Sequence, residues 1–206
     1  MASTADPIPP VAEAPMAPAP LISELTHADA EAYAHAHLVL LETTYAHLVD
    51  PDFAHLRWAE RDERIAELHA DVDEAADARA AGRTPAQRHL VAMNAYGTIV
   101  GVACAAAEVG EWERPFLGDA WVPAAVPTNL AHLYLMPGAH GTGLAQRMLD
   151  TALGGAAAYL WVMTDNTRAV AFYRRNGFTV DYGPVNSGQT WGRNPMVRMS
   201  RPDQTP

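Results

Sequence analysis

Hydrophobic and polar positions along the chain recur with two periods, and the order of these periods predicts the secondary structure. Short apolar or alternating runs, typical of strands, occupy residues 21–25, 89–93, 98–107, 130–135, 159–162, 179–182 and 196–199. Apolar residues at helical spacing predict helices over about residues 30–50, 58–75, 144–152 and 167–175. The order β, α, α, β, β, β, α, β, α, β, β predicts one α/β domain.

Residues 129–149 join a strand to a helix through a glycine-containing turn. The alternating run stops at Met136-Pro137, and a helical pattern begins after Gly141-Thr142-Gly143. Glycines let the backbone approach a ligand closely, and the first N–H groups of a helix have no intrahelical acceptor. The turn is therefore expected to bind a phosphate group.

Two common nucleotide-binding loops fit this turn poorly. A P-loop ends in Gly-Lys-Ser/Thr, and the stretch has no lysine; a dinucleotide loop has a third glycine where this chain has Gln146. Residues 140–145, HGTGLA, instead resemble motif A of the GNAT superfamily of N-acetyltransferases, in which Arg or Gln is followed by two residues, Gly, one residue and Gly or Ala. The departure from that motif is His140.

A second segment strengthens the resemblance. Residues 159–162, YLWV, read as a buried strand, and residues 166–178, NTRAVAFYRRNGF, follow it. They are similar to motif B of the same family, in which a strand ends in Asn-x-x-Ala and is followed by Phe-Tyr and Gly-Phe. Two motifs in this order are far more specific than either one alone.

The resemblance implies an α/β, single-domain GNAT fold with a mixed, mostly antiparallel sheet of six to seven strands flanked by about four helices. In the family, the fourth and fifth strands splay apart and the pantetheine arm of acetyl-CoA lies between them, with the pyrophosphate on the motif A turn. Asn166 is also expected to cap the motif B helix. The implied acetyl-CoA contacts are Leu133, Tyr134, Leu135, His140, Gly141, Thr142, Gly143, Leu144, Ala145 and Asn166.

The resemblance also implies a catalytic role for Tyr173. Related enzymes have a tyrosine at this motif B position that protonates the departing thiolate, and a phenol with a pKa near about 10 suits that task. The alternative is that Tyr173 only packs against the cofactor arm.

The general base is left open by the sequence. Several family members have Glu where this chain has Asn129, which cannot accept a proton, and strict strand alternation puts His132 on the opposite face. Glu111, Glu113, Asp119 or a chain of water molecules are the other candidates.

Composition narrows the class of protein. The 206 residues carry a formal net charge of −10, which argues against nucleic-acid binding and favours an amine-bearing partner. The chain has no apolar run long enough for a membrane span and no signal-peptide pattern, so a soluble, cytoplasmic protein is expected. Many GNAT proteins form dimers, and a homodimer is compatible with the resemblance.

Other catalytic and metal chemistries lack the required residues. The single cysteine, Cys104, lies in an apolar run and is expected to be a buried, inert thiol. His35, His37 and His47 do not have the i, i+4 spacing of a helical metal site, so no metal is expected. No Gly-x-Ser-x-Gly elbow is present.

The domain is expected to span residues 21–201, between a disordered Pro- and Ala-rich tail over 1–20 and a short tail over 202–206. The long connection over residues 109–128 contains Trp112, Phe116 and Trp121, which would either wall an acceptor pocket or cap the core.

These features favour an acetyl-CoA-dependent N-acetyltransferase acting on a primary amine of a small molecule, such as an antibiotic or a metabolite. A protein N-terminal or lysine acetyltransferase is the first alternative, and an open peptide groove would favour it. A non-catalytic acyl-CoA-binding module is the second, because of Asn129 and His140.

Overall fold

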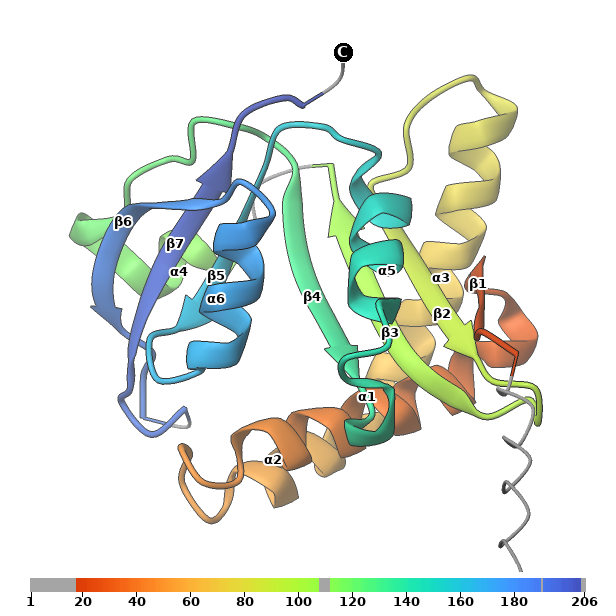
Figure 1. Ribbon diagram of the computed structural model, residues 1–206, viewed down its shortest axis with the longest axis horizontal. Coiled ribbons are helices and arrows are strands. Elements are labelled where there is room, and N and C mark those ends of the chain that lie inside the picture. The colour runs from red at the N-terminus through yellow and green to blue at the C-terminus, as the bar shows by residue number, and fades with distance from the viewer. Residues whose placement is uncertain (1–17, 108–111, 190, 205–206) are drawn as a thin grey trace, which may run out of the picture.

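A seven-stranded sheet forms the centre of the fold and has helices on both of its faces (Figure 1). The computed structural model describes residues 18–107, 112–189 and 191–204. The strands are β1 (Leu21–Glu24), β2 (Gln87–Met93), β3 (Ile99–Ala106), β4 (Asn129–Leu135), β5 (Ala158–Met163), β6 (Thr179–Asn186) and β7 (Pro195–Arg201). The α-helices are α1 (Ala30–Tyr45), α2 (Phe53–Ala59), α3 (Arg61–Ala80), α4 (Glu113–Leu117), α5 (Leu144–Leu153) and α6 (Thr167–Arg175), and the 3-10 turns are η1 (His27–Asp29), η2 (Gly118–Ala120) and η3 (Pro137–Ala139).

The sheet has one weak junction, between β4 and β5. Its strand order is β1-β2-β3-β4-β5-β7-β6, and every neighbouring pair is antiparallel except the parallel pair β4 and β5. That pair is joined at a single register position, Asn129 opposite Tyr159. Beyond this point the two strands diverge, and the sheet opens toward the carboxyl end of β4.

Each face of the sheet is covered by its own hydrophobic core. On one face, Met148 and Leu149 of α5 pack with Leu90, Leu130 and Leu160 from the strands. The partly buried apolar residues of α6 join the same cluster. On the other face, α1 and α3 pack on β2 and β3, with a separate cluster that includes Tyr33, Leu40, Leu68, Val91 and Val102.

A β-bulge at Ala131 changes which residues of β4 share a face. Cys104 pairs with His132, but the next residue of β3, Ala105, pairs with Leu130, so Ala131 is an extra residue. Asn129 pairs with Ala106, two positions from Cys104, and therefore lies on the same face as His132. The alternation argument that placed these two side chains on opposite faces is thus wrong.

The predicted fold class is confirmed, with differences at the ends of elements. The seven strands occur in the predicted order, and two short helices, α2 and α4, add to the four expected ones among the described residues. The first helix ends at Tyr45 and not near Asp50, and the second begins only at Arg61 and extends to Ala80. The expected amino-terminal tail lies largely outside the described residues, as do residues 205–206.

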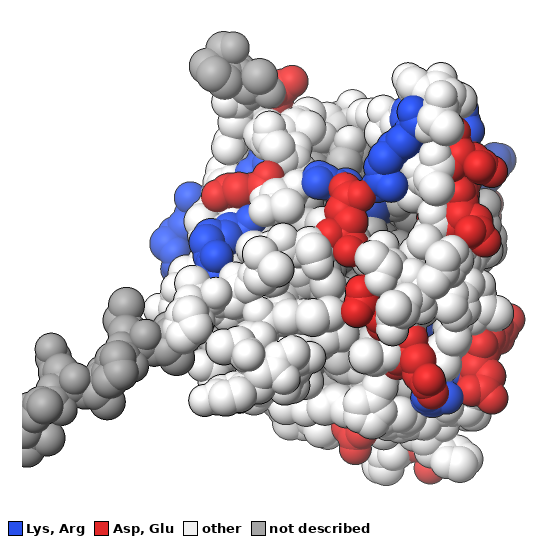
Figure 2. All heavy atoms as spheres, turned by 90° about the vertical axis from the view of Figure 1, so that its right-hand side faces the viewer, with Lys and Arg blue, Asp and Glu red and all other residues white. Residues whose placement is uncertain are grey.

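The face formed by β1 and α3 carries much of the negative charge, but arginines are mixed with it (Figure 2). Glu24 pairs with Arg79 and Arg88, and Arg83 approaches Glu74 at 3.6 Å. Exposed pairs of this kind contribute about 0–1 kcal/mol each. They neutralise part of the charge on this face.

Leu149 tests the core that holds α5 on the sheet. Its side chain is fully buried in the α5 cluster. Leu149→Ala is expected to lower the free energy of unfolding by about 2–5 kcal/mol, because it removes buried methyl groups and leaves a cavity. Chemical denaturation measures the effect, and Tyr96→Ala is the control, since Tyr96 is 91% exposed. Equal, small effects of both substitutions would contradict this packing.

Candidate active site

A cavity of about 500 Å³ occupies the opening between β4 and β5. Its lining comes from β4, from the turn before α5, from α6 and from the end of α1. Of the residues expected to contact the cofactor, all but two line this cavity. The exceptions are Thr142, whose hydroxyl donates to the carbonyl oxygen of Ala139 at 2.8 Å, and Leu144, which is buried in the core.

The strand β4 offers the cavity an unpaired edge. On one side its backbone pairs with β3 along its length, whereas on the β5 side pairing is confined to Asn129. The backbone donors and acceptors of residues 130–135 that point toward β5 therefore face the cavity. An extended ligand with amide groups could pair with them as an added strand would.

The glycine turn closes one end of the cavity. Gly141 and Gly143 have φ of 76° and 80°, a left-handed conformation that costs other residues about 1–2 kcal/mol. Gly143 is the N-cap of α5, so the N–H groups of the first turn of this ten-residue helix are available to an anion. The local geometry is that of a phosphate site.

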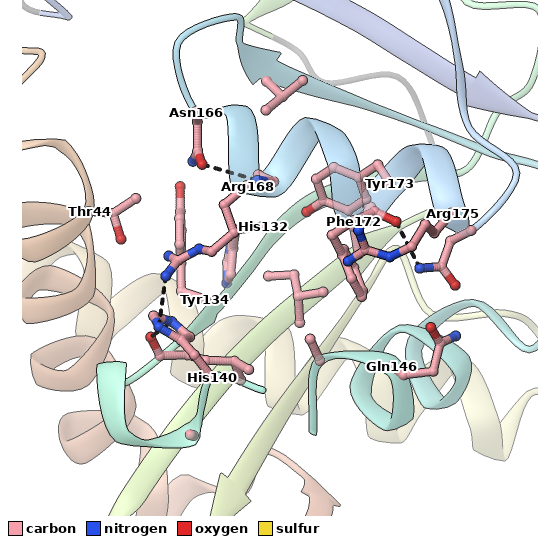
Figure 3. Close-up of a pocket in the computed structure, with 18 of the residues that line it drawn as sticks. Thr44, His132, Tyr134, His140, Gln146, Asn166, Arg168, Phe172, Tyr173 and Arg175 are labelled. Atoms are coloured by element: carbon pink, nitrogen blue, oxygen red, sulfur yellow. Dashed lines mark hydrogen bonds between the residues drawn. The ribbon is translucent and has the colours of Figure 1, made fainter. Parts of the chain in front are cut away.

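His140 connects this turn to α6. Its Nδ1 accepts a hydrogen bond from Nη1 of Arg168 at 2.7 Å, because a guanidinium can only donate, and its Nε2 lies 3.2 Å from the carbonyl oxygen of Leu135 (Figure 3). Partial burial, followed by the charge of Arg168, lowers the pKa of His140. The neutral ring thus places a cation beside the phosphate turn.

Two arginines of the site were not identified from the sequence. Arg168 and Arg175 both line the cavity and lie seven residues apart, which puts them on one face of α6. Their positive charges suit the phosphates of a nucleotide-bearing cofactor, in a chain whose net charge is −10. The sequence signal that could have identified them is the seven-residue spacing of these two arginines in the helix that follows Asn166.

Asn166 caps α6 as expected. Its Oδ1 accepts a hydrogen bond from the N–H of Ala169 at 3.2 Å, and its side chain also interacts with Tyr45. The residue also lines the cavity.

Tyr173 lies in a group of three phenols around the cavity. The hydroxyl of Tyr134 donates to that of Tyr45 at 3.4 Å. Tyr173 lies near both, since it raises the pKa of Tyr134 and its own pKa is raised by Tyr45. Burial, and then the neighbouring Tyr45, raise the pKa of Tyr173 well above its ordinary value. Its phenol therefore stays protonated at neutral pH.

The aromatic connection lies away from this cavity. Trp112 is the N-cap residue of α4, Phe116 lies on that helix, and both are about half exposed. Trp112 contacts Trp161, which does line the cavity, with ring centroids 6.0 Å apart. Glu113 is buried and accepts a hydrogen bond from Tyr159 at 2.7 Å.

The acidic residues expected as candidates for the general base are not found at the cavity among the described residues. Glu113 and Asp119 are not among the residues that line the cavity, and Glu111 lies outside the described residues. Among the described residues, no group of three or more His, Cys, Asp or Glu side chains is arranged to hold a metal ion. Cys104 is buried, and burial raises the pKa of its thiol to about 12.

A comparison with protein-family models identifies the family that the sequence of this site matches. Residues 85–180 match the model described as an acetyltransferase (GNAT) domain. The chain contains a GNAT acetyltransferase domain. The resemblance given by the two sequence motifs is thereby confirmed.

Curated relatives of this GNAT domain match over a shorter stretch. Uncharacterized N-acetyltransferases of Mycobacterium tuberculosis and Mycobacterium bovis are 40% identical over 59 residues. The match covers 26% of this chain and 38% of each relative. The chain thus spans well under two thirds of the length of these relatives.

Solved structures share the fold over most of the chain. A PaiA N-acetyltransferase of Thermoplasma acidophilum in complex with coenzyme A has a TM-score of 0.57 at 18% identity, covering 87% of this chain and 97% of that one. A spermidine N-acetyltransferase SpeG chimera from Vibrio cholerae has a TM-score of 0.55 at 17% identity, covering 90% and 96%. A Corynebacterium glutamicum protein described as histone acetyltransferase HPA2 and related acetyltransferase has a TM-score of 0.52 at 25% identity, covering 91% and 98%.

In the described part of this chain, no helix is long and apolar enough to span a membrane.

The glycine turn can be tested at single positions. Gly141→Ala and Gly143→Ala are each expected to weaken coenzyme A binding about tenfold, because a left-handed backbone costs alanine about 1–2 kcal/mol and the turn would relax away from the phosphates. Gly138→Ala, in the neighbouring 3-10 turn η3, is the matched control, since its φ is ordinary and an added methyl group meets no atom within 4 Å. Calorimetric titration measures all three, and an equal loss in the control would refute a specific role of the left-handed glycines.

The two arginines allow a separate test on one helix. Arg168→Ala and Arg175→Ala are each expected to raise the Kd for coenzyme A about 5- to 20-fold, the loss of one partly solvated charge-assisted contact. Arg174→Ala is the control, since Arg174 is exposed on α6 and does not line the cavity. The difference from the control should shrink at high salt. Identical Kd values for all three variants would remove the arginines from the site.

Proposed function

We propose that the protein is an acetyl-CoA-dependent N-acetyltransferase that transfers the acetyl group to a primary amine of a small molecule. The observation that carries the proposal is the cavity between β4 and β5, which combines a free strand edge, a left-handed glycine turn and Tyr173. The strand edge would pair with the pantetheine arm and the turn would bind the pyrophosphate. Acetyl-CoA is then a co-substrate, and no metal is needed for the chemistry.

Tyr173 would act as the general acid. When the amine attacks the thioester, the C–S bond breaks and its electron pair leaves on sulfur. The thiolate takes the phenol proton of Tyr173, and Tyr173 then regains a proton from water. Tyr173 lines the same cavity as the N-cap residue Asn166 but from the other end of α6 (Figure 3).

The end of the cavity at α1 supports a small acceptor over a peptide. Thr44 and Tyr45 line this end, and Trp191 packs against Tyr45 and Phe53 with ring centroids 5.3 and 4.6 Å apart. The amide nitrogen of Asn194 also donates to the carbonyl oxygen of Leu48. The segment before β7 is thereby held against the chain that follows α1, where a peptide groove would need an open surface.

Release of free thiol from acetyl-CoA, measured with a panel of small amines, tests the proposal. The wild type is expected to turn over at least one primary amine, and Tyr173→Phe is expected to lower kcat about 10²-fold, the low end of what a general acid contributes. Tyr182→Phe is the matched control, because Tyr182 is absent from the cavity lining and its hydroxyl donates to the carbonyl oxygen of Ala120.

Two outcomes would contradict this account. Tight acetyl-CoA binding without turnover of any amine would identify a non-catalytic binding module. Turnover of lysine-containing peptides alone would identify a protein acetyltransferase.

A further inference from the structure

A buried polar cluster lies behind the cavity, between the sheet and the helices α1 and α3. Its centre is the hydroxyl of Tyr33, which lies 2.7 Å from Nε2 of His132 and 3.2 Å from Nδ1 of His89. Nε2 of His89 in turn lies 2.9 Å from a carboxylate oxygen of Asp71. We call Tyr33, His89 and Asp71 the polar chain. It joins His132, which lines the cavity, to a carboxylate that is partly exposed.

The carboxylate at the far end sets the direction of the hydrogen bonds. The Asp71 carboxylate only accepts, so Nε2 of His89 carries the proton and Nδ1 of His89 has a lone pair. The single hydroxyl proton of Tyr33 then has two acceptors apart from His132, namely Nδ1 of His89 and the carbonyl oxygen of Ala103 at 3.0 Å. In the structure the hydroxyl donates to the carbonyl oxygen of Ala103. With its one proton used there, the Tyr33 oxygen accepts from Nε2 of His132 at 2.7 Å.

This direction leaves Nδ1 of His132 as a free basic nitrogen. The ring is also fixed in orientation, because His37 stacks on it at 4.2 Å and Tyr134 lies nearly parallel to it at 6.0 Å between centroids. The bulge at Ala131 places this ring on the same strand face as Asn129.

We propose that His132 is the general base of the acetyl transfer, and that the polar chain holds its Nδ1 lone pair toward the reacting amine. This inference rests on the proposed function. The amine nitrogen forms the C–N bond, one of its protons moves to Nδ1 of His132, and the thiolate takes a proton from Tyr173. When the products leave, His132 returns its extra proton to water and Tyr173 regains a proton from water, so both residues are restored.

The environment of His132 agrees with a base that is neutral before the reaction. Its pKa is well below the ordinary value, first because the ring is buried and then because of His37, His89 and Arg64. A weak base suffices here, because a nitrogen that has attacked a carbonyl carries a positive charge and is more acidic than a free ammonium group. The other titratable groups around the cluster are Cys104 and Tyr134.

The tautomer of His132 tests the arrangement without any assay of activity. Nitrogen NMR of the folded protein is expected to show His132 protonated at Nε2 and not at Nδ1. In Tyr33→Phe the partner oxygen is lost, and the ring should become a mixture of both tautomers. A wild-type His132 protonated at Nδ1 would overturn the proposal, whatever the enzyme turns over.

Kinetics then test the role of His132 as a base. His132→Gln is expected to lower kcat about 10²-fold, with the Kd for coenzyme A within twofold of the wild type, and added imidazole should restore part of the rate in His132→Ala. Partial rescue is not expected from a merely structural role. A folded His132→Gln variant with the wild-type rate would overturn the proposal.

Two carboxylates of α3 provide the matched pair for the polar chain. Asp71→Asn keeps a hydrogen-bonding group of the same size but lets its N–H₂ reverse the tautomer of His89, and it is expected to lower kcat about tenfold. Asp73→Asn is the control, because Asp73 is exposed and contacts His27 at the surface. Equal rates for the two variants would show that the polar chain does not act on His132. Failure of the wild type to acetylate any amine would instead count against the proposed function, and the NMR result separates the two cases.

Discussion

The site depends on one constraint, which is that β4 and β5 pair at a single position and then part. A sheet normally satisfies the backbone groups of each inner strand on both sides, and an inner strand with an open edge is costly unless something else pairs with it. Here the open edge borders a cavity that is closed by the glycine turn and by α6. The α5 core contains residues from both sides of the opening, Leu130 of β4 and Leu160 of β5 among them, so the two halves of the sheet stay joined where the strands do not pair.

The bulge at Ala131 has the next largest effect on the site. It turns His132 to the face that α1 and α3 cover, where the polar chain can reach it. Buried polar side chains are costly unless they form hydrogen bonds, and the contacts around Tyr33 engage its hydroxyl, Nδ1 of His89 and Nε2 of His132. The same strand thus supplies backbone groups to one part of the cavity and a side chain to another.

Much of this arrangement could be predicted from the sequence. The order of strands and helices followed from periodicity. The two motifs predicted the cofactor contacts and Tyr173, and of these predicted residues only Thr142 and Leu144 do not line the cavity. What periodicity could not give was the bulge, because one extra residue in a strand leaves no mark on a short apolar run. His89 and Asp71 are likewise far from β4 in sequence, and only the pairing of β2 with β3 and the packing of α3 bring them to Tyr33.

A structure of the protein with acetyl-CoA bound tests the central claim most directly. The account predicts that the pantetheine amides pair with the open edge of β4 near Leu133 to Leu135, that the pyrophosphate lies on the Gly141–Gly143 turn, and that the thioester lies within hydrogen-bonding distance of Tyr173. Acetyl-CoA bound elsewhere on the protein, with the cavity between β4 and β5 unoccupied, would contradict it.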